Sequence, residues 1–188
     1  MTELGAGQCP PDLLGQVLSA VKVSEVRGME LLDVTLRDYP GDPRLHFLRG
    51  SLLAGRQLYE EARREMAAAV QLAPGYAVAR FQLGFLELTS GLPREAEATW
   101  GPLDALDEHH PLRLFAAGLR HLAHDRFGEC IAALRQGMEV NIENPPINAD
   151  MQLILDKLES DGLASGANEP VSATHLLLQQ YASKDTRH

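Results

Sequence analysis

The sequence predicts an all-α protein, a solenoid of antiparallel helix pairs closed by a C-terminal capping helix. Three observations lead to this fold class: a set of residues returns every 34 positions, prolines separate the repeats, and helix-favouring residues are abundant. Ala, Leu, Gln, Glu and Arg lose little rotamer freedom in a helix, so their abundance favours helical structure. At 188 residues the chain is long enough to bury a core of its own.

The repeat is visible in three stretches that align without gaps and begin at Pro43, Ala77 and Pro111. Each stretch carries a Phe, a Gly three residues later, and a small residue twelve residues after the Gly: Phe47, Gly50 and Ala62, then Phe81, Gly84 and Ala96, then Phe115, Gly118 and Cys130. A helical Gly costs about 0.8–1 kcal/mol relative to Ala. Its return at one phase therefore indicates a position where two helices cross closely.

This pattern resembles the tetratricopeptide repeat family, whose unit is two antiparallel helices with small residues where they cross. Gly50, Gly84 and Gly118 match the first helix, while Ala62, Ala96 and Cys130 match the second. Tyr59 and Phe127 supply the aromatic residue that opens the second helix, whereas Pro93 departs from the family pattern. The resemblance implies a right-handed superhelical solenoid.

The repeats set the expected domain organisation of the chain. A helical repeat domain is predicted over residues 9–159, with a degenerate first repeat that has Gly28 at its crossing. Pro145 and Pro146 should stop the last repeat, and Asn148 should cap a new helix. The predicted segments are a disordered N-terminus (1–8), four repeats (9–42, 43–76, 77–110 and 111–144), a cap (147–159), a flexible linker (160–170) and a tail with a short apolar helix (171–188).

In the tetratricopeptide family, the first helices line a concave groove in which partners usually bind. By phase, we expect this groove to be lined by Phe47, Ser51, Val78, Phe81, Phe85, Leu88, Leu112, Phe115, Leu119 and Leu122. A contiguous apolar patch usually marks a binding surface. The alternative, equally weighted for any one residue, is that it packs between helices as core. The positions that grip a peptide carboxylate in some family members hold no cation, so a carboxylate clamp is not expected.

The tail offers a second occupant for the groove. Its apolar residues Leu176, Leu177, Leu178 and Tyr181 could cover the groove of their own chain, or enter a neighbouring molecule and make a homodimer.

Composition and motifs argue against other classes of function. The formal charge is −9 with no basic block, which disfavours nucleic-acid binding. No apolar stretch reaches membrane-spanning length and no signal peptide is evident, so a cytoplasmic protein without membrane insertion is expected. Cys9 and Cys130 lack metal-site spacing, and His109-His110 and His121-x-x-His124 are interpreted as structural or solvated. We expect no enzyme activity, metal or cofactor.

Three functions remain open at this stage. The leading hypothesis is a protein–protein interaction scaffold or adaptor that binds an apolar peptide segment in the groove. The second is a chaperone of the bacterial secretion type that shields a hydrophobic client, since size, acidity and an apolar three-repeat groove resemble the translocator chaperones of type III secretion. The third is a self-associating structural subunit with its own tail in the groove. The excess of Arg over Lys hints at a GC-rich bacterial genome.

Overall fold

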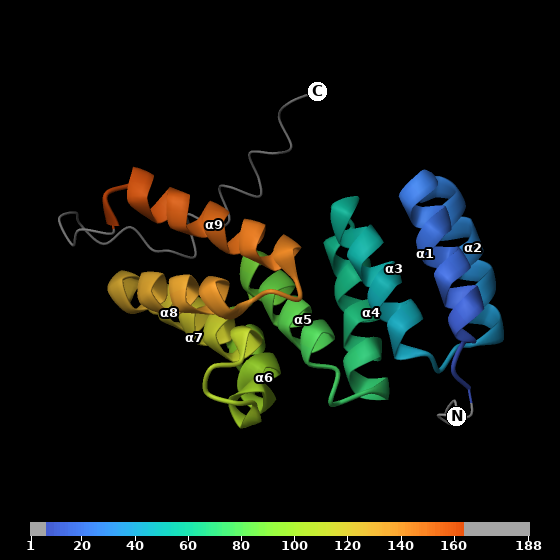
Figure 1. The fold of residues 1–188 in the computed structure, drawn as a ribbon, viewed down its shortest axis with the longest axis horizontal. Coiled ribbons are helices and arrows are strands. Elements are labelled where there is room, and N and C mark those ends of the chain that lie inside the picture. Colours follow the sequence, from blue (N-terminus) through green and yellow to red (C-terminus); the bar gives the residue numbers. More distant parts are fainter. Residues whose placement is uncertain (1–6, 164–188) are drawn as a thin grey trace. The chain divides into compact units, whose positions relative to one another are not determined.

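The computed structural model describes residues 7–163, and within them the protein contains nine α-helices, one 3-10 helix and no strand (Figure 1). The expected all-α class is therefore confirmed for this part of the chain. The elements are α1 (Pro11–Val23), α2 (Glu25–Asp38), α3 (Pro43–Gly55), α4 (Tyr59–Leu72), α5 (Ala77–Thr89), α6 (Pro93–Trp100), η1 (Gly101–Ala105), α7 (Pro111–Ala123), α8 (Phe127–Val140) and α9 (Pro145–Ser160). The chain divides into two compact units, residues 1–83 and 84–188, with the division inside α5.

In the first unit, α1 packs against α2, α2 against α3, and α3 against α4. A single residue, Ser24, separates α1 from α2, and its hydroxyl accepts a hydrogen bond from the Arg27 N–H at the start of α2. Such side-chain caps satisfy helix N–H groups that have no partner within the helix. The buried core of this unit contains Cys9, Val17, Leu32, Leu36 and Leu45.

In the second unit, α7 packs against α8, and α8 against α9. Helix α6 has only 8 residues, whereas α4 and α8 each have 14, because α6 changes into the 3-10 helix η1 at Gly101. Pro102 explains the change, since proline lacks the N–H that an α-helix needs and its ring clashes with the preceding turn. Trp100, at the end of α6, and Leu103, in η1, are both buried.

The 34-residue step recurs in where the helices begin. Helices α3, α5 and α7 begin at Pro43, Ala77 and Pro111, and the second helices begin at Glu25, Tyr59, Pro93 and Phe127. Helix α1 departs from the step, because it begins at Pro11, 32 residues before Pro43.

The predicted close crossings are confirmed by the surroundings of the repeated glycines. A Cβ atom on Gly50 would lie 3.1 Å from the Ala62 carbonyl oxygen, and one on Gly118 would lie 3.3 Å from that of Cys130. Gly84 instead faces the indole of Trp100, where a Cβ would lie 2.6 Å from Cε2. At Gly50 and Gly118 the nearest atoms are the side-chain atoms Met66 Cγ and Leu134 Cδ2, each at 2.7 Å. At all three positions, therefore, a buried side chain of the second helix occupies the space that a Cβ atom would need.

The last helix differs from the prediction at its start. Helix α9 begins at Pro145, two residues before residue 147, where the capping helix was expected to begin. Prolines suit the first turn of a helix, because an N–H there has no helical partner anyway. Asn148 therefore lies inside α9 and does not cap it. Its amide donates to the carbonyl oxygens of Met138 (3.4 Å) and Asn141 (3.3 Å), joining α9 to the end of α8.

The ends of the described region also bear on the expected segments. Residues 161–163 form a turn after α9 and Leu163 is buried, although a flexible linker was expected from residue 160. The rest of the linker and the tail, with Leu176, Leu177, Leu178 and Tyr181, lie outside the described residues, as do residues 1–6. Among the described residues, no helix is long and apolar enough to cross a membrane.

Candidate functional site

The structure divides the ten residues predicted for the groove into two groups. Seven are buried: Phe81, Phe85, Leu88, Leu112, Phe115, Leu119 and Leu122. Phe47 and Val78 are half-buried, and Ser51 is exposed. A partner can reach only this second group without rearranging the fold, and all three members lie in the first unit.

Phe115 shows how an apolar residue of a first helix becomes core. Its side chain is fully buried, and its ring occupies the space that a side chain at Gly137 of α8 would fill, since a Cβ atom on Gly137 would lie only 2.6 Å from Phe115 Cδ1 and Cε1. Gly137 lies in the last turn of α8, where a glycine still weakens the helix, so it is a sequence signal of a large neighbour. The repeat alignment did not use this signal, because Gly137 has no counterpart at the same phase in the other repeats.

The accessible face of α3 is built around an aromatic pair. Phe47 of α3 and Tyr76, which precedes α5, meet edge to face, with ring centroids 5.3 Å apart and planes at 64°. Edge-to-face pairs are favoured by the ring quadrupoles. The Ser51 hydroxyl donates to the Phe47 carbonyl oxygen at 2.9 Å, so it is satisfied within its own helix. The first unit therefore presents a half-buried aromatic pair whose geometry is set by packing.

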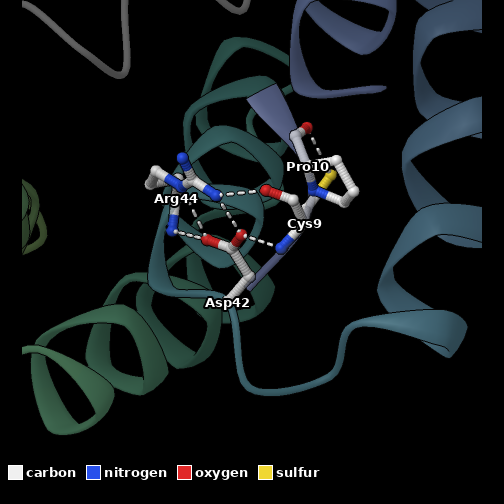
Figure 2. Close-up of polar contacts among 4 residues, drawn as sticks. All are labelled: Cys9, Pro10, Asp42 and Arg44. Carbon is white, nitrogen blue, oxygen red and sulfur yellow. Dashed lines mark hydrogen bonds and ion pairs between the residues drawn. The ribbon is translucent and has the colours of Figure 1, made fainter. Parts of the chain in front are cut away.

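A polar cluster lies at the start of the same helix, and Figure 2 shows how its residues face one another. The fully buried carboxylate of Asp42 accepts hydrogen bonds from the Cys9 N–H at 2.8 Å and from the Arg44 N–H at 2.9 Å. It also accepts from Arg44 Nε at 3.0 Å and Nη2 at 2.6 Å. Arg44 Nη2 donates in turn to the Cys9 carbonyl oxygen at 2.7 Å. Together, Asp42 and Arg44 bind both main-chain polar groups of Cys9.

The electrostatics of this cluster follow from the pairing of its charges. Burial tends to raise the pKa of Asp42, but the hydrogen bonds from Arg44 and Cys9 outweigh it and leave that pKa below its usual value. Burial also raises the pKa of the Tyr76 hydroxyl, on which the charges of Arg44 and Asp42 act in opposite directions. The cluster is therefore an ionised, fully paired carboxylate and guanidinium beside a neutral phenol.

A cleft of about 450 Å³ lies between α2 and α3, and its walls carry charges of both signs. Arg49 lies 3.2 Å from both Asp33 of α2 and Glu65 of α4. The ring of His46 lies between the Glu65 carboxylate at 2.7 Å and the Pro40 carbonyl oxygen at 2.9 Å. These contacts join three helices, and their charges compensate one another, so the cleft has no dominant sign. The repeat alignment missed this network, because the partners come from three different helices.

The two cysteines are buried, and two histidines of the described region make defined polar contacts. Burial raises the pKa of Cys9, and it raises that of Cys130 to about 12, so both thiols are protonated at neutral pH and are poor nucleophiles. The ring of His110 caps α7, and His124 pairs with Glu97 at 2.7 Å. Within residues 7–163, no three His, Cys, Asp or Glu side chains are grouped so that they could hold a metal ion.

Comparison with known proteins adds no family to this description. No protein-family model matches the chain, and a search of curated proteins finds no match either.

Proposed function

We propose that this chain is a cytoplasmic protein–protein interaction module of the tetratricopeptide type, which binds an apolar peptide segment on its first helices. The observation that carries the proposal is the half-buried Phe47–Tyr76 pair. Aromatic side chains dominate the energetics of protein interfaces, because they bring a large contact area at a small cost in conformational entropy. A pair already held in place loses little further freedom when a partner binds.

The burial of the other apolar residues supports a binding surface smaller than the ten-residue groove expected from the sequence. Phe81 and Phe115 are fully buried, so their replacement by alanine would remove core packing and could not test binding alone. Phe47 and Val78 keep part of their surface accessible, and Ser51 of α3 is exposed. We therefore place the centre of the proposed binding surface in the first unit.

The test is selection of peptides on the full-length protein from a random peptide library, followed by affinity measurement with purified variants. Phe47→Ala should weaken binding of the selected peptides by about 1–3 kcal/mol, roughly 5- to 150-fold, as expected for a central aromatic anchor. Val34→Ala is the matched control, because Val34 is an apolar residue of the same unit, 48% exposed on α2.

The two variants separate the proposal from a general loss of structure. Circular dichroism should show that both retain the helical content of the wild type. If the selected apolar peptides bind Phe47→Ala as tightly as the wild type, or if Val34→Ala is the weaker binder, the proposed surface is wrong.

A further inference from the structure

The N-terminal segment before α1 is attached to the first unit through the main chain of one residue. Gly7 and Gln8 are exposed, and Cys9 is completely buried. The Cys9 N–H donates to Asp42 Oδ2 and its carbonyl oxygen accepts from Arg44 Nη2, across 33 and 35 positions of sequence. This arrangement is visible in Figure 2. Both contacts come from side chains of the α3 start, and neither depends on the identity of the residue that they hold.

Recognition of a main chain by a carboxylate and a guanidinium is independent of sequence, apart from the space left for the side chain. That space is small and apolar, since Cys9 belongs to the core cluster with Val17, Leu32 and Leu45. Any extended segment with a small apolar residue would present the same N–H and C=O groups. The Asp42–Arg44 pair is therefore a main-chain binding site that the chain's own Cys9 occupies.

This site lies beside the aromatic surface of α3. Arg44 and Phe47 are three residues apart in α3, which places them on one side of the helix. The charges of Arg44 and Asp42 act on the hydroxyl of Tyr76, which packs against Phe47. A segment bound at Phe47 and Tyr76 therefore reaches the guanidinium that holds Cys9.

We propose that residues 7–9 form a strap that opens locally while the rest of the first unit stays folded, and that the main chain of a bound peptide takes the place of Cys9. Opening of the strap is independent of the proposed function, whereas its exchange with a bound peptide rests on that function. Local openings of this kind occur where few buried contacts hold a segment, and Cys9 is the one buried residue among residues 7–9. In the closed strap, the Cys9 thiol is buried and points toward the Pro10 carbonyl oxygen at 3.5 Å, so its reaction with a thiol reagent reports opening.

The experiment measures maleimide labelling of Cys9 in the full-length protein carrying Cys130→Ala, which leaves a single thiol. Alanine is the residue that two other repeats have at this position, Ala62 and Ala96. Asp42→Asn keeps the shape of the side chain but turns one acceptor into a donor. It should label at least about tenfold faster, as expected for the loss of one hydrogen bond to a charged group.

Asp38→Asn is the matched control, since it removes the same charge from an exposed position of the same unit. It should label within about twofold of the parent, as surface substitutions usually have small effects. In subdenaturing urea the labelling rate of the parent should stay constant, because local opening exposes little surface, whereas global unfolding would make it rise steeply. The strap proposal is overturned if Asp42→Asn labels at the same rate as the Cys130→Ala parent. It is also overturned if the labelling rate of the parent rises steeply with urea.

The exchange with a bound peptide is tested by adding a peptide selected on the wild-type protein. If its main chain replaces Cys9, labelling of Cys9 should accelerate as the peptide saturates the protein, and Phe47→Ala should abolish the acceleration. An unchanged or slower rate at saturation overturns the exchange. Failure to select any apolar peptide contradicts the proposed function, while the strap is still decided by the Asp42→Asn and urea measurements.

Discussion

Replacement of Gly28 by alanine tests the closest helix crossing in the first unit. Gly28 lies in α2, and a Cβ atom there would be 2.5 Å from the Val21 Cα and 2.7 Å from the Val21 nitrogen in α1. Ordinary contacts of a Cβ begin at 3.4 Å, so the α1 backbone would have to move by about 0.9 Å. Because the obstacle is main chain, no change of rotamer can relieve it.

The expected magnitude is the difference of two effects. Overpacking of a well-packed interface costs about 1–3 kcal/mol, and a clash with backbone belongs in the upper half of that range. Alanine recovers about 0.8–1 kcal/mol of helix propensity relative to glycine. We therefore expect Gly28→Ala to lower the free energy of unfolding by about 1–2 kcal/mol.

Gly15→Ala provides the matched control within the same helix pair. Gly15 is exposed in α1, and a Cβ atom there would have no neighbour within 4 Å. Only the propensity effect remains, so this substitution should raise the free energy of unfolding by about 0.5–1 kcal/mol. Urea unfolding followed by far-ultraviolet circular dichroism measures both values. If Gly28→Ala stabilises the protein as much as Gly15→Ala does, the close crossing of α1 and α2 is wrong.

Two further predictions concern the buried carboxylate and the buried ring. The pKa of Asp42 is lower in the folded protein than its ordinary value, so its stabilising effect is present above the unfolded pKa and lost as the pH falls through the folded pKa. The difference in unfolding free energy between wild type and Asp42→Asn should thus be constant above about pH 5 and shrink below about pH 4; a difference that persists in acid would contradict the assignment. Phe115→Ala should cost about 3–5 kcal/mol in urea unfolding. Gly137→Ala should destabilise the wild type more than it destabilises Phe115→Ala, because the ring that blocks its Cβ is then gone and only Leu114 Cβ, at 3.3 Å, stays close; an equal effect in both backgrounds would disprove that contact.

The helical class and the places where helices approach closely could be predicted from the order of the residues. Gly50 and Gly118 could be interpreted because a helix tolerates glycine at a cost, and its return at one phase requires a physical reason. That reason concerns one helix pair, whose residues are close in the sequence, so it can be recognised from the sequence alone. The start of α9 at Pro145 was missed, because Pro145 and Pro146 were interpreted as the end of the preceding repeat although prolines also favour the first helical turn.

Which apolar residues are buried in the core could not be predicted, because burial depends on contacts between helices. Neighbouring positions in a helix differ by about 100° in direction, so an uncertainty of one residue in phase exchanges a groove wall for an interior position. Phe115 is buried because Gly137, on another helix, leaves room for its ring, whereas Phe47 stays half-buried against Tyr76. The Asp42–Arg44 site depends on Cys9, more than thirty residues away. Contacts across such separations leave no local periodicity, and folding alone brings the partners together.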